Sequence, residues 1–372
     1  MQRLKPPFRA DHVGSLLRPQ WVKDARESFA AGKFSELDLQ RIENIEIEKA
    51  VRRQQQAGLK FATDGEFRRS WWHFDFFKDL TGCELYKTDG IQFAGMTTRG
   101  ESVRVTGRLD FPADHPMIEH FKLLKDRCDP VRVMPKMTIP SPSVLHFRGG
   151  RAAISQDAYP SLDDFFVDLA KTYRKAVKAF YDVGCRYLQF DDTAWGYLCS
   201  EEELGKLRTR GDDVGSLPQV YARVINYAIA ERPADMTITT HICRGNFRST
   251  WVSSGGYEPI AETLLAETNY DGYFLEYDSE RAGGFEPLRF LPKGDKIVVL
   301  GLVTSKTGAL ERKDDIKQRV MEAAKFVSLD QLALSPQCGF ASTEEGNILT
   351  EEEQWSKLRL VADIAKDVWG TT

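Results

Sequence analysis

Short apolar runs alternate with longer amphipathic stretches along almost the whole chain, and this alternation limits the fold more than any other feature. Eight runs of this kind are candidate strands, and most are nearly continuous in apolar residues, as strands buried on both faces should be. They are Arg9–Ser15, Lys60–Gly65, Val131–Thr138, Tyr187–Asp191, Thr237–Cys243, Gly272–Tyr277, Lys296–Val303 and Gln331–Ser335. Helical spacing of apolar residues is seen in Asp38–Ala57, Ser161–Val183, Leu217–Glu231, Tyr257–Thr268, Lys313–Val327 and Glu351–Val368.

This order of strands and helices predicts an α/β fold, a (β/α)8 TIM barrel in which residues 1–372 form a single domain. A doubly wound open sheet is the alternative. Neither GxGxxG after a strand nor GxxxxGK[ST] is present, so the usual nucleotide-binding signals are absent from the sequence. Segment Glu84–Phe111 breaks the rhythm with repeated glycines and predicts one or two β-hairpins inserted after the second strand unit.

Charge and composition argue against several classes of function. The chain has 51 Lys and Arg against 55 Asp and Glu, a net charge of −4, and no basic block, so we expect no binding to nucleic acid. The first residues lack the apolar core of a signal peptide, and no apolar run approaches the roughly 20 residues of a membrane-spanning helix. We therefore expect a cytoplasmic protein that does not bind membranes. Its six cysteines form no CxxC pair and indicate free thiols or metal ligands.

Several metal-ligating side chains stand at the carboxyl ends of predicted strands, where barrel enzymes have their active sites. His241 and Cys243 are two residues apart on one strand, so their side chains point to the same side. Glu276 ends the next strand, and Cys338 follows the last one. One nitrogen, one oxygen and two sulfur donors suit tetrahedral zinc. The alternative is a buried histidine beside a small core residue, and the spacing alone does not decide between the two.

Carboxylates also stand at strand ends. Asp191 and Asp192 are adjacent, so their side chains point to opposite faces and only one can face the barrel mouth. The other could cap the following helix or pair with an arginine. Glu66 ends the second strand in a similar way. Carboxylates at a barrel mouth can bind an ammonium group or transfer protons. A structural ion pair with Arg68 or Arg69 is the alternative.

Two further features bear on ligand binding. The Val13-Gly14-Ser15 turn after the first strand could present backbone N–H groups to a carboxylate or phosphate, or be an ordinary tight turn. An aromatic cluster after the second strand could wall a substrate pocket or pack a helix on the core. Its members are Phe67, Trp71, Trp72, Phe74, Phe76 and Phe77.

The strand-end residues together resemble the catalytic barrel of the cobalamin-independent methionine synthase family, especially its short, single-barrel bacterial members. The resemblance runs nearly end to end and rests on six short motifs in the same order. They are His-Val-Gly-Ser at 12–15, Asp-Gly-Glu-Phe at 64–67, Gln-Phe-Asp-Asp at 189–192, His-Ile-Cys at 241–243, Glu276 and Ser-Pro-Gln-Cys-Gly at 335–339.

The resemblance implies a catalytic zinc and methyl transfer to the thiol of homocysteine to form methionine. It implies that zinc is bound by His241, Cys243, Glu276 and Cys338. It also implies that the substrate carboxylate lies on the turn formed by His12, Val13 and Ser15, while Glu66 and Asp191 hold the amino group.

The chain differs from the long members of the family in two respects. Their N-terminal barrel, which helps to build the folate site, is absent, so the methyl donor could be methyltetrahydrofolate, a corrinoid protein or a small methylated thiol or sulfonium. The histidine that they carry after the seventh strand is also absent. Lys306, Ser305 or Asp192 could protonate the leaving group in its place.

Two other functions remain open at this point. The epoxyalkane:coenzyme M transferases look similar and also use a His-x-Cys site, but coenzyme M has no amino group, whereas Glu66 and Asp191 are suited to bind one. A barrel that binds methionine or homocysteine without turnover would not need a full set of zinc ligands. No feature of the sequence indicates an oligomeric state.

Overall fold

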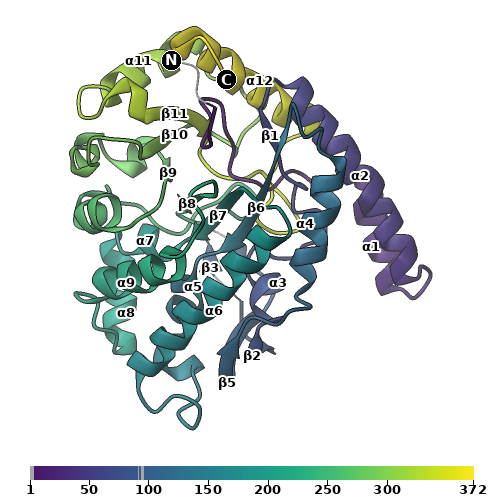
Figure 1. Ribbon diagram of the computed structural model, residues 1–372, viewed down its shortest axis with the longest axis vertical. Helices are drawn as coiled ribbons and strands as arrows, with labels where there is room; N and C mark the ends of the chain where they lie inside the picture. Colours follow the sequence, from purple (N-terminus) through teal and green to yellow (C-terminus); the bar gives the residue numbers. More distant parts are fainter. Residues whose placement is uncertain (1–3, 91, 94–95) are drawn as a thin grey trace.

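The computed structural model describes residues 4–90, 92–93 and 96–372. Residues 1–3, in the stretch where we expect no signal peptide, and residues 91 and 94–95, in the expected insertion, lie outside this description. At the centre is a parallel sheet of seven strands in the order β1-β6-β7-β8-β9-β10-β11, curled so that helices cover its outside (Figure 1). The strands are β1 Phe61–Ala62, β6 Met134–Pro140, β7 Tyr187–Asp192, β8 Thr237–Ile242, β9 Gly272–Glu276, β10 Ile297–Val303 and β11 Leu332–Pro336. The predicted α/β barrel class is confirmed.

The prediction of a strand at Arg9–Ser15 is wrong. The segment makes one parallel bridge, from Ala10 to Leu334 of β11, with Asp11 N donating to Leu334 O at 2.9 Å. The backbone on either side bonds to a side chain instead, because the Asp11 carboxylate accepts hydrogen bonds from the N–H groups of Phe8 and His12. A carboxylate that satisfies these donors leaves fewer of them for a neighbouring strand.

A buried ion pair fixes this first segment inside the barrel. Lys136 of β6 lies 3.0 Å from Asp11, and both side chains are fully buried. The same ammonium donates to His12 O at 2.6 Å, and Tyr187 Oη donates to Asp11 at 2.8 Å. A buried charge is tolerated only when its partners satisfy it, so these contacts hold residues 11 and 12 in one place.

Twelve α-helices are seen in the described residues, six more than the periodicity predicted. They are α1 Gln20–Ala30, α2 Glu36–Gln56, α3 Phe74–Phe77, α4 Pro116–Arg127, α5 Pro142–Gly149, α6 Leu162–Asp182, α7 Ala194–Tyr197, α8 Glu201–Arg210, α9 Leu217–Ile229, α10 Glu258–Ala261, α11 Lys313–Ala323 and α12 Glu351–Trp369. Short 3-10 helices occupy Gly150–Ala153, Glu280–Ala282, Glu286–Phe290 and Leu329–Gln331, and a π-helical turn continues α10 over Glu262–Glu267.

The helix ends follow local chemistry. α6 begins where predicted, because the Ser161 side chain accepts a hydrogen bond from Asp163 N. The predicted helix at Tyr257–Thr268 changes to a wider turn near its end, where the Thr268 hydroxyl donates to Leu264 O at 2.5 Å. None of the described helices is both long and apolar enough to cross a bilayer.

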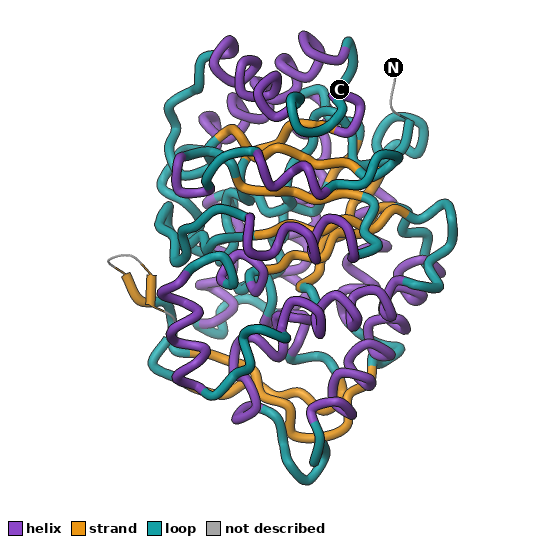
Figure 2. Tube along the Cα trace, turned by 90° about the vertical axis from the view of Figure 1, so that its left-hand side faces the viewer, coloured by secondary structure: helices purple, strands orange, loops and turns teal. Residues whose placement is uncertain are grey.

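The predicted insertion consists of two antiparallel hairpins, one inside the other. β2 Thr81–Lys87 pairs with β5 Glu101–Asp110, and between them β3 Gln92–Phe93 pairs with β4 Met96–Thr97. Figure 2 shows the short inner hairpin projecting from the body of the molecule. The two segments that flank the inner hairpin approach each other closely at Gly100, where a Cβ atom would lie 1.8 Å from Thr88 O.

Candidate functional site

A pocket opens at the carboxyl ends of the strands. Loops that follow β1, β6, β7, β8 and β11 line it, together with part of the inserted hairpins. Its lining includes three of the expected metal ligands, His241, Cys243 and Cys338, and both of the expected amino-binding acids, Glu66 and Asp191. The position agrees with the general location of active sites in barrels.

The four expected metal ligands lie together although they come from three parts of the chain. His241 is in β8 and Cys243 directly follows it, Glu276 ends β9, and Cys338 follows β11. One ligand atom from each residue lies within 4.8 Å of all the others. The two sulfur atoms are 3.6 Å apart.

Several polar atoms of this cluster are buried without a hydrogen bond in the described chain, which suits a bound ion. Both ring nitrogens of His241 and the Oε2 atom of Glu276 lack a hydrogen bond among the described residues. Oε1 of Glu276 accepts from Arg244 N at 2.9 Å, and Arg281 lies 3.6 Å from Oε2. Buried polar atoms normally have a hydrogen-bond partner. A cluster of zinc-ligating side chains with such atoms left over therefore fits a tetrahedral metal ion.

The cluster favours a thiolate at Cys338 only, because the hydrogen bond to Cys338 and burial raise the pKa of the Cys243 thiol. The Cys243 thiol, as a hydrogen-bond partner, and the nearby His241 hold the pKa of Cys338 well below its usual range. Burial lowers the pKa of His241, but Cys338, Asp191 and Glu276 together outweigh this effect and raise the pKa above its usual value. Burial raises the pKa of Glu276, and the Lys306 ammonium partly offsets this.

Glu66 and Asp191 lie in the same pocket as the thiols. Asp191 pairs in register with His241 across β7 and β8, and Oδ1 accepts from Gln189 Nε2 at 2.7 Å. Burial and the neighbouring Glu66 raise the pKa of Asp191 to about 7. Oε1 of Glu66 accepts from Thr138 Oγ1 at 2.8 Å, while Oε2 has no hydrogen-bond partner in the described chain. The ion pair considered as the alternative for Glu66 is also present, because Arg69 Nη1 lies 3.5 Å from Oε1. Oε2 of Glu66 is the acceptor that suits an ammonium group.

The turn after the first segment presents unpaired backbone donors. No hydrogen bond of the described residues uses the N–H groups of Val13, Gly14 or Ser15. The carbonyl groups are held, since Gln189 Nε2 donates to Val13 O at 2.6 Å and Thr63 Oγ1 to Gly14 O at 2.7 Å. Gly14 has φ +149°, and a Cβ atom there would lie 2.7 Å from Thr138. Consecutive free N–H groups form a concavity that suits a carboxylate.

Three expected site residues lie apart from the pocket lining. The His12 ring contacts Gln54, with 2.8 Å from Nε2 to Oε1, and lies tilted against the Phe61 ring with centroids 4.8 Å apart. Asp192 is fully buried and accepts hydrogen bonds from Ser143 Oγ and from Ala194 N, the first N–H group of α7. Lys306 is buried close enough to the cluster for its charge to act on Cys243, Glu276 and Cys338, and its Nζ atom has no hydrogen-bond partner among the described residues.

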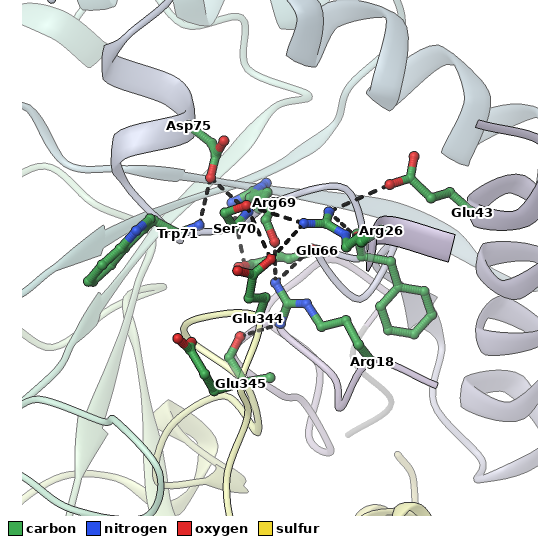
Figure 3. A network of polar contacts seen from close by, with 12 residues as sticks. Arg18, Arg26, Glu43, Glu66, Arg69, Ser70, Trp71, Asp75, Glu344 and Glu345 are labelled. Atoms are coloured by element: carbon green, nitrogen blue, oxygen red, sulfur yellow. Dashed lines mark hydrogen bonds and ion pairs between the residues drawn. The ribbon is translucent and has the colours of Figure 1, made fainter. Parts of the chain in front are cut away.

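A network of ion pairs holds the loop between β1 and α3, which carries Glu66 (Figure 3). Arg18 donates to the carbonyl groups of Glu66 and Arg69 at 2.8 and 2.9 Å. Arg26 donates to Phe67 O at 2.7 Å and pairs with Glu344 at 3.1 Å. These contacts support the left-handed backbone of Glu66, at φ +60°, which a non-glycine residue rarely adopts.

The same network reaches the insertion. Glu344 pairs with Arg99 at 2.7 Å and accepts from Ser70 Oγ at 3.3 Å. Asp75 accepts from the N–H groups of Ser70 and Trp71 at 2.8 and 2.6 Å. The hairpins, the loop after β1 and the loop after Cys338 are therefore tied together.

Sequence reasoning missed several residues of the pocket wall. His73, Arg148, Tyr197 and Asn246 line the pocket, as do Phe93 of the insertion and Phe247 of the loop after β8. The Trp-Trp-His run at 71–73 is the only sequence signal for any of them, and the predicted aromatic cluster does not include His73. Their placement depends on loop conformation, which has no periodic pattern.

Comparison with known sequences gives a consistent picture. A family model described as cobalamin-independent synthase, catalytic domain, matches residues 8–367. The uncharacterized Bacillus subtilis protein YxjH is 54% identical over 366 residues, which cover 98% of this chain and 96% of that protein. A methionine synthase of Sulfolobus acidocaldarius is 22% identical over 334 residues, covering 88% and 84%.

Solved structures have the same architecture. A candidate vitamin B12-independent methionine synthase from Listeria monocytogenes is 47% identical, with a TM-score of 0.81 and coverage of 99% of this chain and 100% of that one. A B12-independent methionine synthase from Shewanella, solved with selenomethionine, is 19% identical, with a TM-score of 0.71 and coverage of 97% of each chain. The second likeness concerns the fold alone.

Proposed function

The chain belongs to the cobalamin-independent methionine synthase family, and from this premise we propose that it is a zinc-dependent methyltransferase that converts homocysteine to methionine. The observation that supports this most is the cluster of His241, Cys243, Glu276 and Cys338, whose ligand atoms lie within 4.8 Å of one another. Three of these ligands face the pocket that also holds the two acids Glu66 and Asp191.

In this proposal the four clustered residues hold zinc. Bound zinc lowers the pKa of a coordinating thiol, so that the substrate is available as thiolate at neutral pH. The negative charge of two cysteine ligands keeps the substrate sulfur nucleophilic.

The rest of the pocket orients the amino acid. Glu66 and Asp191 accept hydrogen bonds from its ammonium group, and the free N–H groups of Val13 and Ser15 donate to its carboxylate. These contacts direct the thiol toward the two cysteines that line the pocket. Homocysteine sulfur then bonds to the methyl carbon, and the electron pair of the broken bond stays with the donor.

Proton delivery to the departing donor falls to Lys306 rather than Asp192 in this scheme. Lys306 carries a buried ammonium group without a hydrogen-bond partner in the described chain, and its charge acts on Glu276 and both cysteines. Asp192 is committed to Ser143 and to the start of α7. We place the reaction in the cytoplasm, because its two cysteine ligands need a compartment that keeps thiols reduced.

The test combines metal analysis with turnover. We expect about one zinc ion per chain, and X-ray absorption at the zinc edge should show one more sulfur ligand after homocysteine is added. Methionine formation is then followed with methyltetrahydrofolate, methylcobalamin and S-methylmethionine as donors. A different result would indicate a coenzyme M-type thiol as substrate. In that case the protein contains zinc, the zinc gains no sulfur ligand when homocysteine is added, and 2-mercaptoethanesulfonate inhibits the enzyme whereas methionine does not. Methionine binding without turnover of any donor would indicate a binding protein.

A further inference from the structure

One wall of the pocket is not used by homocysteine in the scheme above. It is formed by Trp72 and His73 after β1, Arg148 at the end of α5 and Tyr197 in α7. Phe93 of the insertion and Phe247 after β8 lie against each other at the same pocket, with ring centroids 5.4 Å apart. This wall is aromatic and carries hydrogen-bond donors, whereas the amino-binding part of the pocket carries acids.

His73 is the most informative residue of this wall. It is fully buried, yet both ring nitrogens lack a hydrogen-bond partner among the described residues. Its orientation is fixed by stacking on Trp72, with centroids 4.3 Å apart and planes 19° apart, and on Phe74 at 3.8 Å. A buried polar ring that is held rigidly, lines a pocket and has no partner points to a ligand that supplies one.

The charge state of His73 defines what it can bind. Burial, assisted by the positive charge of Arg148, lowers the pKa of His73 well below its usual value, so the ring is neutral at physiological pH. A neutral imidazole offers one N–H donor and one acceptor nitrogen. Nε of Arg148 and the hydroxyl of Tyr197 are also buried without a partner in the described chain. The wall thus offers several donors and one permanent positive charge.

We infer that Trp72, His73, Arg148 and Tyr197 form the subsite for the methyl donor, and that His73 hydrogen-bonds its leaving group. The inference rests on the proposed function. The subsite takes a donor with a flat ring for Trp72 and nitrogen or oxygen acceptors for His73 and Arg148. It disfavours a sulfonium, which brings a second positive charge toward Arg148.

The role of His73 follows from the electron flow. As the methyl carbon bonds to the homocysteine sulfur, the electron pair of the breaking bond remains on the donor, and its acceptor atoms become more electron-rich. A fixed N–H group aimed at such an atom stabilises the transition state more than the ground state.

The experiment uses the full, zinc-loaded chain with His73→Phe, which keeps the stacking ring, and His73→Gln, which keeps an amide for hydrogen bonding. Methionine formation is measured with methyltetrahydrofolate, methylcobalamin and S-methylmethionine. Methyl iodide serves as the reference donor, because iodide offers no nitrogen or oxygen acceptor to His73. For the best of the three donors, we expect the rate relative to methyl iodide to fall about 100-fold in His73→Phe. The fall should be much smaller in His73→Gln.

Three outcomes would overturn this inference while leaving the proposed function standing. The relative rate could stay within twofold in His73→Phe. The rates with methyl iodide and with the best donor could fall together along with methionine affinity, which would make His73 a packing residue. The wild-type protein could use S-methylmethionine best, which would contradict the inference that the subsite takes a donor with a flat ring and nitrogen or oxygen acceptors. By contrast, a wild-type protein that methylates homocysteine from none of these donors refutes the proposed function itself.

Discussion

The sulfur atoms of Cys243 and Cys338 lie 3.6 Å apart in the folded protein, although 95 residues separate them in the chain. Each thiol follows a different strand of the barrel, and the sheet register brings them together with His241 and Glu276. Such a pair can share one metal ion, and this arrangement leads to the first prediction.

Replacement of either cysteine by serine should remove the metal and abolish turnover. A serine hydroxyl is a poor zinc ligand, and three remaining donors hold the ion weakly. Zinc content is measured by elemental analysis, and circular dichroism checks that the fold is retained. The control is Cys83→Ser in β2, outside the cluster, which should keep both zinc and activity. Full zinc occupancy in Cys243→Ser or Cys338→Ser would show that the ligand set is wrong.

Two neighbouring acids should respond differently to the same substitution. Asp191→Asn should raise the KM for homocysteine about 10- to 100-fold at unchanged zinc content, because a charged hydrogen bond to the ammonium group is lost. Asp192→Asn should lower the free energy of unfolding by about 1 to 3 kcal/mol, through its bonds to Ser143 and Ala194, with little change in KM. Steady-state kinetics and urea denaturation separate the two effects. Equal KM values for Asp191→Asn and the wild type would rule out the amino-group role.

Lys306→Met should lower kcat about 100-fold, as expected for the loss of a proton donor, while methionine affinity stays the same. Turnover and calorimetric binding are measured on the same zinc-loaded preparation. Lys306→Arg is the discriminating variant, since arginine keeps the charge but does not release a proton. If Lys306→Arg turns over at the wild-type rate, the residue acts through its charge alone.

Stability should depend on pH through His146, which lies away from the pocket. Burial lowers the pKa of His146 to about 4, whereas the unfolded chain has a value near 6.5. The unfolded state therefore binds the proton first as pH falls, and the stability contributed by neutral His146 is lost below about 6.5. The destabilisation caused by His146→Phe should thus shrink by about 2 kcal/mol between pH 7 and pH 5.

Tyr221→Phe is the control for this titration. Tyr221 Oη lies 2.8 Å from His146 Nδ1, so the variant loses the same hydrogen bond but no group that titrates in this range. Its effect on the free energy of unfolding should be the same at both pH values. A pH-independent effect of His146→Phe in the same denaturation series would contradict the prediction.

The strands of the barrel could be predicted because they are buried on both faces and read as continuous apolar runs. The segment at Arg9–Ser15 has only Ala10 and Val13 as apolar residues, and the Asp11 carboxylate takes up neighbouring backbone donors, an effect without periodicity. The clustering of His241 with Cys338 followed from their places at strand ends. The position of His73 did not, because the loop that carries it is held by contacts to residues more than 250 positions away, such as that of Ser70 with Glu344.

The pairing of the first segment with β11 has a consequence for how the protein is made. Asp11 and Arg9 bond to Leu334, and Cys338 follows only a few residues later. While the chain is still on the ribosome, its first segment has no strand to close against, and the metal cluster lacks its last thiol. The pocket can therefore assemble only after nearly the whole chain has been synthesised. Chains that end between residues 243 and 338 carry Cys243 without Cys338, so they lack one of the four residues of the cluster.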